Sequence, residues 1–165
     1  MSEALEHTSP VEIVGRFLSR APIDLYGIAG GLGLGVRLRH DWPDSISGSI
    51  TRDGPQYIVT LNGHHAAARQ RFTFAHEIGH CILHRDLIGD GITDDGHYRS
   101  GQPGYIESEA NTYAANILMP AKLMRQAWIG GRQSRAQIAE LFAVSQQAAG
   151  IRLQTLGLPE RPASL

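Results

Sequence analysis

The sequence predicts one small α+β domain, in which a short β-sheet packs on helices and further helices complete the chain. Its 165 residues suit a single compact domain. Apolar residues make up 42% of the chain, which is enough to build a core. A β-hairpin pattern is followed by segments of helical periodicity, and this mixture predicts the α+β class.

Composition excludes several kinds of protein. The net charge of −1 gives no overall attraction to nucleic acid or to anionic membranes. No stretch approaches the roughly 20 apolar residues of a membrane span, so we expect no membrane partner. Cys81 is the single cysteine, and the first residues lack the basic and apolar pattern of a secretory signal. These features predict a cytoplasmic protein.

The first segments predict two short helices and a hairpin. Apolar residues recur at helical spacing over 11–19 and 23–29. The glycine run 30–35 follows a helical segment, so it predicts a turn rather than a dinucleotide-binding loop. The β-prone runs 46–50 and 56–61 flank a turn-rich linker, which predicts the hairpin.

The second half of the sequence is predicted to be helical. Residues 72–84 and 105–118 have helical apolar spacing, and the polar, glycine-rich segment 85–104 between them predicts a loop that could act as a lid or a binding loop. Short helices follow a break at Gly130-Gly131. We therefore expect a main domain over residues 1–130 and a helical appendage, similar to a helix-turn-helix, over residues 131–165.

The predicted helix 72–84 contains an H-E-x-x-H motif, His76 to His80. Histidines four residues apart lie on one helix face and can bind one metal ion, and Glu77 can exchange a proton with a water that the ion activates. A chance occurrence on a solvated helix is the alternative. The flanking residues are mostly apolar, and unpartnered buried charge is costly, so they favour the metal site.

A third metal ligand must come from another helix. His84 lies about 12 Å along the helix axis from the first histidine, which is too far to share an ion. Glu107 and Glu109 begin the next helix, and Glu107 is favoured because Asn111, one turn further on, could orient a neighbouring ligand. Glu109 could instead be a carboxylate that stabilises the helix N-terminus. Two histidines and a carboxylate are typical of a catalytic zinc site.

Two segments resemble the ImmA/IrrE family of zinc metallopeptidases. They are RFTFAHEIGHCILH at 71–84 and ESEANTYAANILMP at 107–120. The resemblance implies a zincin-like domain with Zn²⁺ bound by His76, His80 and Glu107.

The same resemblance implies that Glu77 is the general base of a metalloendopeptidase. It also implies a protein substrate, a helix-turn-helix repressor often encoded beside the protease, whose cleavage changes gene expression. The alternative is a regulatory protein of a toxin–antitoxin-like pair, which docks a repressor or antitoxin without efficient proteolysis.

The hairpin suggests how a substrate could bind. Proteases often add an extended substrate to an exposed sheet edge. Strand 56–61 is the candidate edge, with Tyr57, Ile58 and Val59 as candidate substrate-binding residues. An ordinary core hairpin is the alternative.

The C-terminal segment resembles both the family's tail and a helix-turn-helix. A recognition helix after Ser145 would offer Gln146, Gln147 and Gln154 but only one positive charge, Arg152. Phosphate contacts dominate affinity for DNA, so direct DNA binding is disfavoured. A DNA-binding regulator that uses residues 135–155 remains the third hypothesis, behind a packing or partner-docking role.

Overall fold

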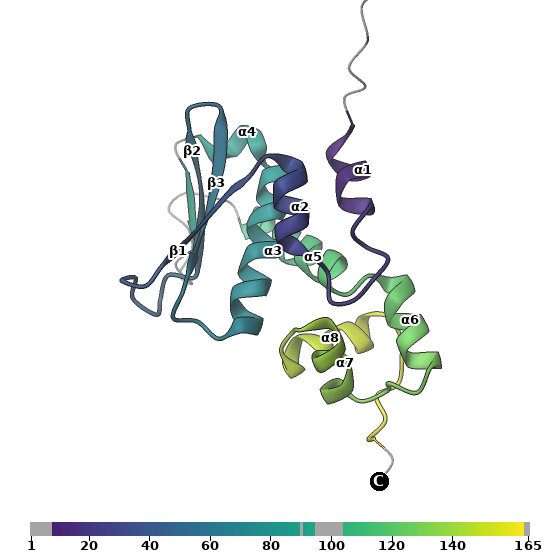
Figure 1. Cartoon of the computed structure of the whole chain (residues 1–165). Coiled ribbons are helices and arrows are strands. Elements are labelled where there is room, and N and C mark those ends of the chain that lie inside the picture. The colour runs from purple at the N-terminus through teal and green to yellow at the C-terminus, as the bar shows by residue number, and fades with distance from the viewer. Residues whose placement is uncertain (1–7, 90, 95–103, 164–165) are drawn as a thin grey trace, which may run out of the picture.

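The computed structural model describes residues 8–89, 91–94 and 104–163 (Figure 1). The helices are α1 (Pro10–Gly15), α2 (Leu25–Leu32), α3 (Ala67–Leu83), α4 (Arg85–Ile88), α5 (Gly104–Leu118), α6 (Ala121–Ile129), α7 (Arg135–Phe142) and α8 (Gln146–Thr155). The strands are β1 (Gly35–Arg39), β2 (Gly48–Asp53), β3 (Gln56–Asn62) and β4 (Ile92–Asp94). No helix in these ranges is both long and apolar enough to cross a membrane.

The fold is the predicted α+β architecture, with helices gathered on one side of a small sheet (Figure 1). The sheet order is β1-β3-β2-β4. β2 and β3 form the predicted antiparallel hairpin, β1 pairs parallel to β3, and β4 pairs antiparallel to β2. Buried side chains of the sheet, among them Ile50 and Val59, join a continuous core with α3 and the C-terminal helices.

The prediction that strand 56–61 is an exposed edge was wrong. β3 is an inner strand, and Ile58 pairs with Gly35 of β1 on one side and with Thr51 of β2 on the other. Val59 also pairs with both neighbours, and Tyr57 pairs with Arg52 of β2, so a substrate strand cannot add along β3 as predicted. Among the described strands, the edges are β1 and β4.

Other element boundaries differ from the predicted ones. α3 begins at Ala67, because the residues before Phe72 are mostly good helix formers. α2 continues through Gly30 and Gly31 to Leu32, and Gly33 caps it in the left-handed conformation at φ 73°. The predicted loop 85–104 contains α4 and β4, while residue 90 and residues 95–103 lie outside the described residues.

A close crossing of α3 and α5 positions the candidate site. A Cβ atom at Gly79 would lie 3.1 Å from the Tyr113 ring and 3.4 Å from the carbonyl oxygen of Ala110. Ala110 and Ala114 are fully buried on the facing side of α5. These small residues bring the two helix backbones together and place the first turn of α5 beside the middle of α3.

Two arginines connect the C-terminal helices to the rest of the chain. Arg71 of α3 donates hydrogen bonds to the carbonyl oxygens of Ala143 (3.2 Å) and Ile23 (2.9 Å). Arg152 of α8 donates one to the carbonyl oxygen of Met119 (3.0 Å). Burial lowers the pKa of the Arg71 guanidinium, which still remains charged at neutral pH. α7 and α8 are therefore fixed to the sheet-bearing part by hydrogen bonds as well as by the shared core.

The turn between α7 and α8 predicts a stabilising substitution. Ala143 ends α7 in the left-handed conformation, with φ 54° and ψ 48°. Ala143→Gly should raise the free energy of unfolding by about 0.5–1 kcal/mol, because glycine adopts this conformation without a Cβ clash. Ala148→Gly, within α8, should instead lower it by about 1 kcal/mol. Urea unfolding of both variants checks this, and a destabilised Ala143→Gly variant would contradict it.

Candidate metal centre

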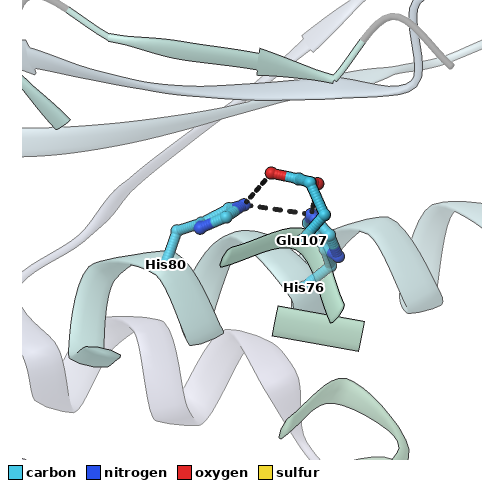
Figure 2. Close-up of side chains that lie close together, drawn as sticks. All are labelled: His76, His80 and Glu107. Atoms are coloured by element: carbon cyan, nitrogen blue, oxygen red, sulfur yellow. Dashed lines mark hydrogen bonds and ion pairs between the residues drawn. The ribbon is translucent and has the colours of Figure 1, made fainter. Parts of the chain in front are cut away.

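Three side chains from two helices converge at the α3–α5 crossing (Figure 2). His76 and His80 are one turn apart on α3, and Glu107 comes from the first turn of α5. The two Nε2 atoms lie 3.1 Å apart, and each lies 3.3 Å from a different oxygen of Glu107. Both histidines are buried, whereas the Glu107 side chain is 25% exposed.

The spacing of these ligand atoms suits one tetrahedral metal ion. Bonds of about 2.0–2.2 Å at tetrahedral angles place neighbouring ligand atoms about 3.3–3.6 Å apart. The two nitrogens are 3.1 Å apart and each lies 3.3 Å from one of the two Glu107 oxygens, which is close to these values. Three ligand side chains leave a fourth position for water or substrate, as in catalytic sites.

Asn111 of α5 orients His76. Its Oδ1 lies 2.8 Å from His76 Nδ1. A histidine that uses Nε2 toward a metal carries its hydrogen on Nδ1, so Asn111 Oδ1 accepts this hydrogen bond and fixes both the tautomer and the ring plane. Glu107 and Asn111 are one helical turn apart, and both face α3.

His84 has the same relation to His80, a role that sequence reasoning missed. The Nδ1 atoms of His80 and His84 lie 2.9 Å apart in the buried interior. With the hydrogen on His80 Nδ1, His84 Nδ1 is the acceptor and its own hydrogen lies on Nε2. That Nε2 faces Glu109 Oε2 at 3.6 Å, which is too long for a hydrogen bond but allows electrostatic attraction. The signal in the sequence was the third histidine at four-residue spacing.

The contact between His80 and His84 predicts an effect on metal affinity. His84→Ala should weaken metal binding by about 10–100-fold, because His80 loses the acceptor that orients it. His84→Asn keeps a side-chain acceptor and should recover part of the loss. Leu83→Ala, at a neighbouring residue that is 46% exposed, is the control. Competition with a chromogenic chelator measures each affinity, and wild-type affinity in His84→Ala would contradict the role.

Glu77 lies beside the ligand cluster on the side of the sheet. Its side chain is fully buried. A Cβ atom at Gly48 would lie 3.5 Å from Glu77 Oε1 and only 2.5 Å from Thr73 Cγ2. Gly48, at the start of β2, therefore lets this strand lie close to α3 and cover the Glu77 carboxylate.

Tyr113 of α5 packs beside Gly79 of α3, close to the ligand histidines, and is uncharged. Burial, with a smaller contribution from Cys81, raises the pKa of Tyr113 to about 12. The Tyr113 hydroxyl therefore stays protonated at neutral pH and adds no charge near the ligand histidines.

The fold and the cluster together define a class of protein. A small sheet on an H-E-x-x-H helix, with a carboxylate ligand from a following helix, is a zincin-like metal-binding domain. Residues 33–154 match the peptidase M78 family, described as the IrrE N-terminal-like domain. The chain belongs to this family.

Curated relatives agree with this assignment. The chain is 36% identical over 108 residues to the radiation response metalloprotease IrrE of Deinococcus radiodurans, covering 59% of this chain and 32% of the relative. It is 37% identical over 75 residues to IrrE of Deinococcus deserti, with 44% and 26% covered. It is 27% identical over 104 residues to the metallopeptidase ImmA of Bacillus subtilis, with 62% and 58% covered. The matched part thus spans about a third or less of each IrrE and about three fifths of ImmA.

Proposed function

We propose that this chain is a zinc-dependent metalloendopeptidase that cleaves a specific protein partner, a helix-turn-helix repressor, and so controls gene expression. The observation that carries the proposal is the cluster of His76, His80 and Glu107, in which both histidines are buried, with the Glu77 carboxylate enclosed beside it. The names of its relatives, metalloprotease and metallopeptidase, support the reaction class.

The donor set favours zinc among the common metals. Two imidazoles and one carboxylate are typical of catalytic zinc, whereas magnesium and calcium prefer sites made of oxygen ligands. When bound, the ion supplies a Lewis acid that activates water and polarises the peptide carbonyl. His76, His80 and Glu107 would hold it, and Asn111 and His84 would keep the two imidazoles in the required tautomer.

Glu77 is the proposed general base and general acid. Its carboxylate would accept a proton from the attacking water and then deliver that proton to the departing amine nitrogen. Burial beside Gly48 keeps bulk water away from the carboxylate, so the proton that it takes up is held for the leaving group.

The C-terminal helices support a protein partner over DNA. Arg152, the one positive charge of α8, is 7% exposed and hydrogen-bonded to Met119 and Asn116. It therefore adds no positive charge to the exposed face of α8 that a DNA backbone would contact, and the remaining exposed face of α8 is uncharged. We propose that residues 1–130 carry the reaction and that residues 131–165 help to dock a repressor, or an antitoxin of similar kind, in the cytoplasm.

Incubation with a repressor tests this function. The zinc-loaded chain is mixed with the helix-turn-helix protein encoded beside its gene, and the products are identified by mass spectrometry. We expect two fragments from cleavage at one bond, and no fragments after chelation of the metal or with an unrelated helix-turn-helix protein. A stable complex without fragments would favour the non-proteolytic, toxin–antitoxin-like role. Neither fragments nor a complex would overturn the proposed substrate.

A further inference from the structure

A groove is lined mainly by residues of α5 and α8, with Phe72 of α3 among them. Its volume is about 520 Å³, within the range of small-molecule sites. Apolar side chains contribute a large part of the lining, and the rest is neutral hydroxyl or amide groups apart from a single charge. The residues that the argument uses are Phe72, Asn111, Asn116, Met119, Ile151 and Arg152.

The one charged side chain in the groove lining has no carboxylate partner within the described part of the chain. Arg152 is 7% exposed, and its Nε and Nη1 donate hydrogen bonds to Met119 O and Asn116 Oδ1, each at 3.0 Å. Its Nη2 has no hydrogen-bond partner among the described residues, and no carboxylate of those residues forms an ion pair with the guanidinium. Burial, with a smaller contribution from Arg125, lowers the pKa of Arg152, but an arginine remains charged at neutral pH.

A buried cation without a counter-ion is costly, and an anionic ligand would offset that cost. Guanidinium groups bind carboxylates well, because their planar N–H donors match the two carboxylate oxygens. The apolar lining, which includes Phe72 and the 57% exposed Ile151, suits a hydrocarbon or aromatic portion of the same molecule. Nucleic acid requires several cations, and this groove provides one.

We propose that this groove is a binding site for a small organic molecule with one carboxylate, which pairs with Arg152 while its apolar portion packs on Phe72 and Ile151. The position of the groove gives this ligand a route to the metal centre. Asn111 lines the groove, and its Oδ1 accepts the hydrogen bond from His76 Nδ1. A bound molecule that contacts Asn111 changes how firmly this amide orients His76, so the ligand is an effector of metal affinity. This second step rests on the proposed zinc site, whereas binding in the groove does not.

Titration of the metal-free protein with a matched pair of probes tests the binding site. 4-Phenylbutyrate has an aromatic ring and a carboxylate. 4-Phenylbutyramide has the same ring and chain, with a neutral amide in place of the carboxylate. We expect 4-phenylbutyrate to bind with a Kd of about 1 mM or tighter and to shift the backbone NMR signals of α5 and α8. 4-Phenylbutyramide should have a Kd at least about tenfold higher. Equal affinity for the two probes, or no binding of either, would overturn the site.

Two variants locate the binding. Ile151→Glu places a negative charge at the groove on an exposed position, so the fold should be kept and binding of 4-phenylbutyrate lost. Ile129→Glu, at an 80% exposed residue of α6 outside the groove, is the matched control and should bind normally. Arg152→Met should bind both probes equally. If Ile151→Glu still bound 4-phenylbutyrate more tightly than 4-phenylbutyramide, as the wild type is expected to do, the site would lie elsewhere and the proposal would be overturned.

The effector role has its own readout. Zinc affinity is measured by chelator competition with and without saturating 4-phenylbutyrate. We expect the ligand to change the zinc Kd by several-fold, and zinc to change the ligand Kd by the same factor, as thermodynamic linkage requires. An unchanged zinc Kd with the probe bound would overturn the effector role. Absence of zinc binding would instead count against the proposed function, because the titration in the groove uses metal-free protein.

Discussion

Glu77→Gln should abolish peptide hydrolysis while leaving the metal bound. Glu77 is not one of the three clustered ligands, so removal of its charge leaves the ligand set intact. Glutamine has the same shape as glutamate but cannot accept and return a proton. General acid–base groups typically contribute 10²–10⁴-fold to the rate, and we expect a loss of about this size. The measurement is cleavage of the repressor, with metal content determined on the same sample.

The control for this substitution is Glu109→Gln, in the same region but outside the ligand cluster. It should retain more than about half of the activity, because Glu109 reaches the centre only through His84, at 3.6 Å. Wild-type cleavage by Glu77→Gln would refute the proton-transfer role. Loss of metal from Glu77→Gln would mean that Glu77 supports the ligand cluster, and the lost activity would then say nothing about proton transfer.

The clustering of the candidate ligands could be predicted from sequence because its determinants are local. The fixed pitch of a helix makes His76 and His80 neighbours wherever α3 lies, and it makes Glu107 and Asn111 neighbours on α5. The remaining step, that the two helices cross at this point, depends on Gly79 fitting against Ala110 and Tyr113. That contact cannot be read from either helix alone. It was implied by the resemblance to a family in which both segments occur.

The edge of the sheet could not be predicted in the same way. Whether β3 is exposed depends on β1, whose residues Gly35–Arg39 pair with Ile58–Asn62 across a long stretch of chain. β1 is short, follows a glycine run and carries two arginines, so local pattern did not indicate a strand. β4 has three residues, which is too few for any periodicity. Tertiary contacts decide where a parallel strand or a short edge strand pairs, so the local sequence gives only a weak signal for such strands.

The role of His84 was missed for a different reason. The distance along the helix excludes it from binding the same ion as His76, and the described ligand cluster does not include it. The same four-residue spacing nevertheless places it against His80, where it accepts a hydrogen bond rather than contributing a ligand. Glu109, considered as a possible ligand, instead faces His84. The four-residue spacing therefore places His84 as a hydrogen-bond partner of a ligand and not as a ligand itself.

Glu107→Ala and Glu109→Ala should show which of the two carboxylates is a metal ligand. We expect about one zinc per wild-type chain after purification without added metal. Glu107→Ala removes one of three ligand groups whose atoms lie 3.1–3.3 Å apart, so its affinity should fall by more than about 100-fold, beyond the loss typical of outer partners. Glu109→Ala removes only the 3.6 Å contact to His84, so its affinity should fall by at most about tenfold.

Elemental analysis together with chelator competition measures both variants, and circular dichroism checks that each is folded. Both substitutions remove one carboxylate from the first two turns of α5, so a general loss of helix stability would affect them equally. A difference between them therefore reports on the metal centre itself. Retention of zinc by Glu107→Ala would mean that the two histidines bind the ion with some other group. Equal loss in both variants would mean that the charge near His80 and His84, rather than direct ligation by Glu107, holds the metal.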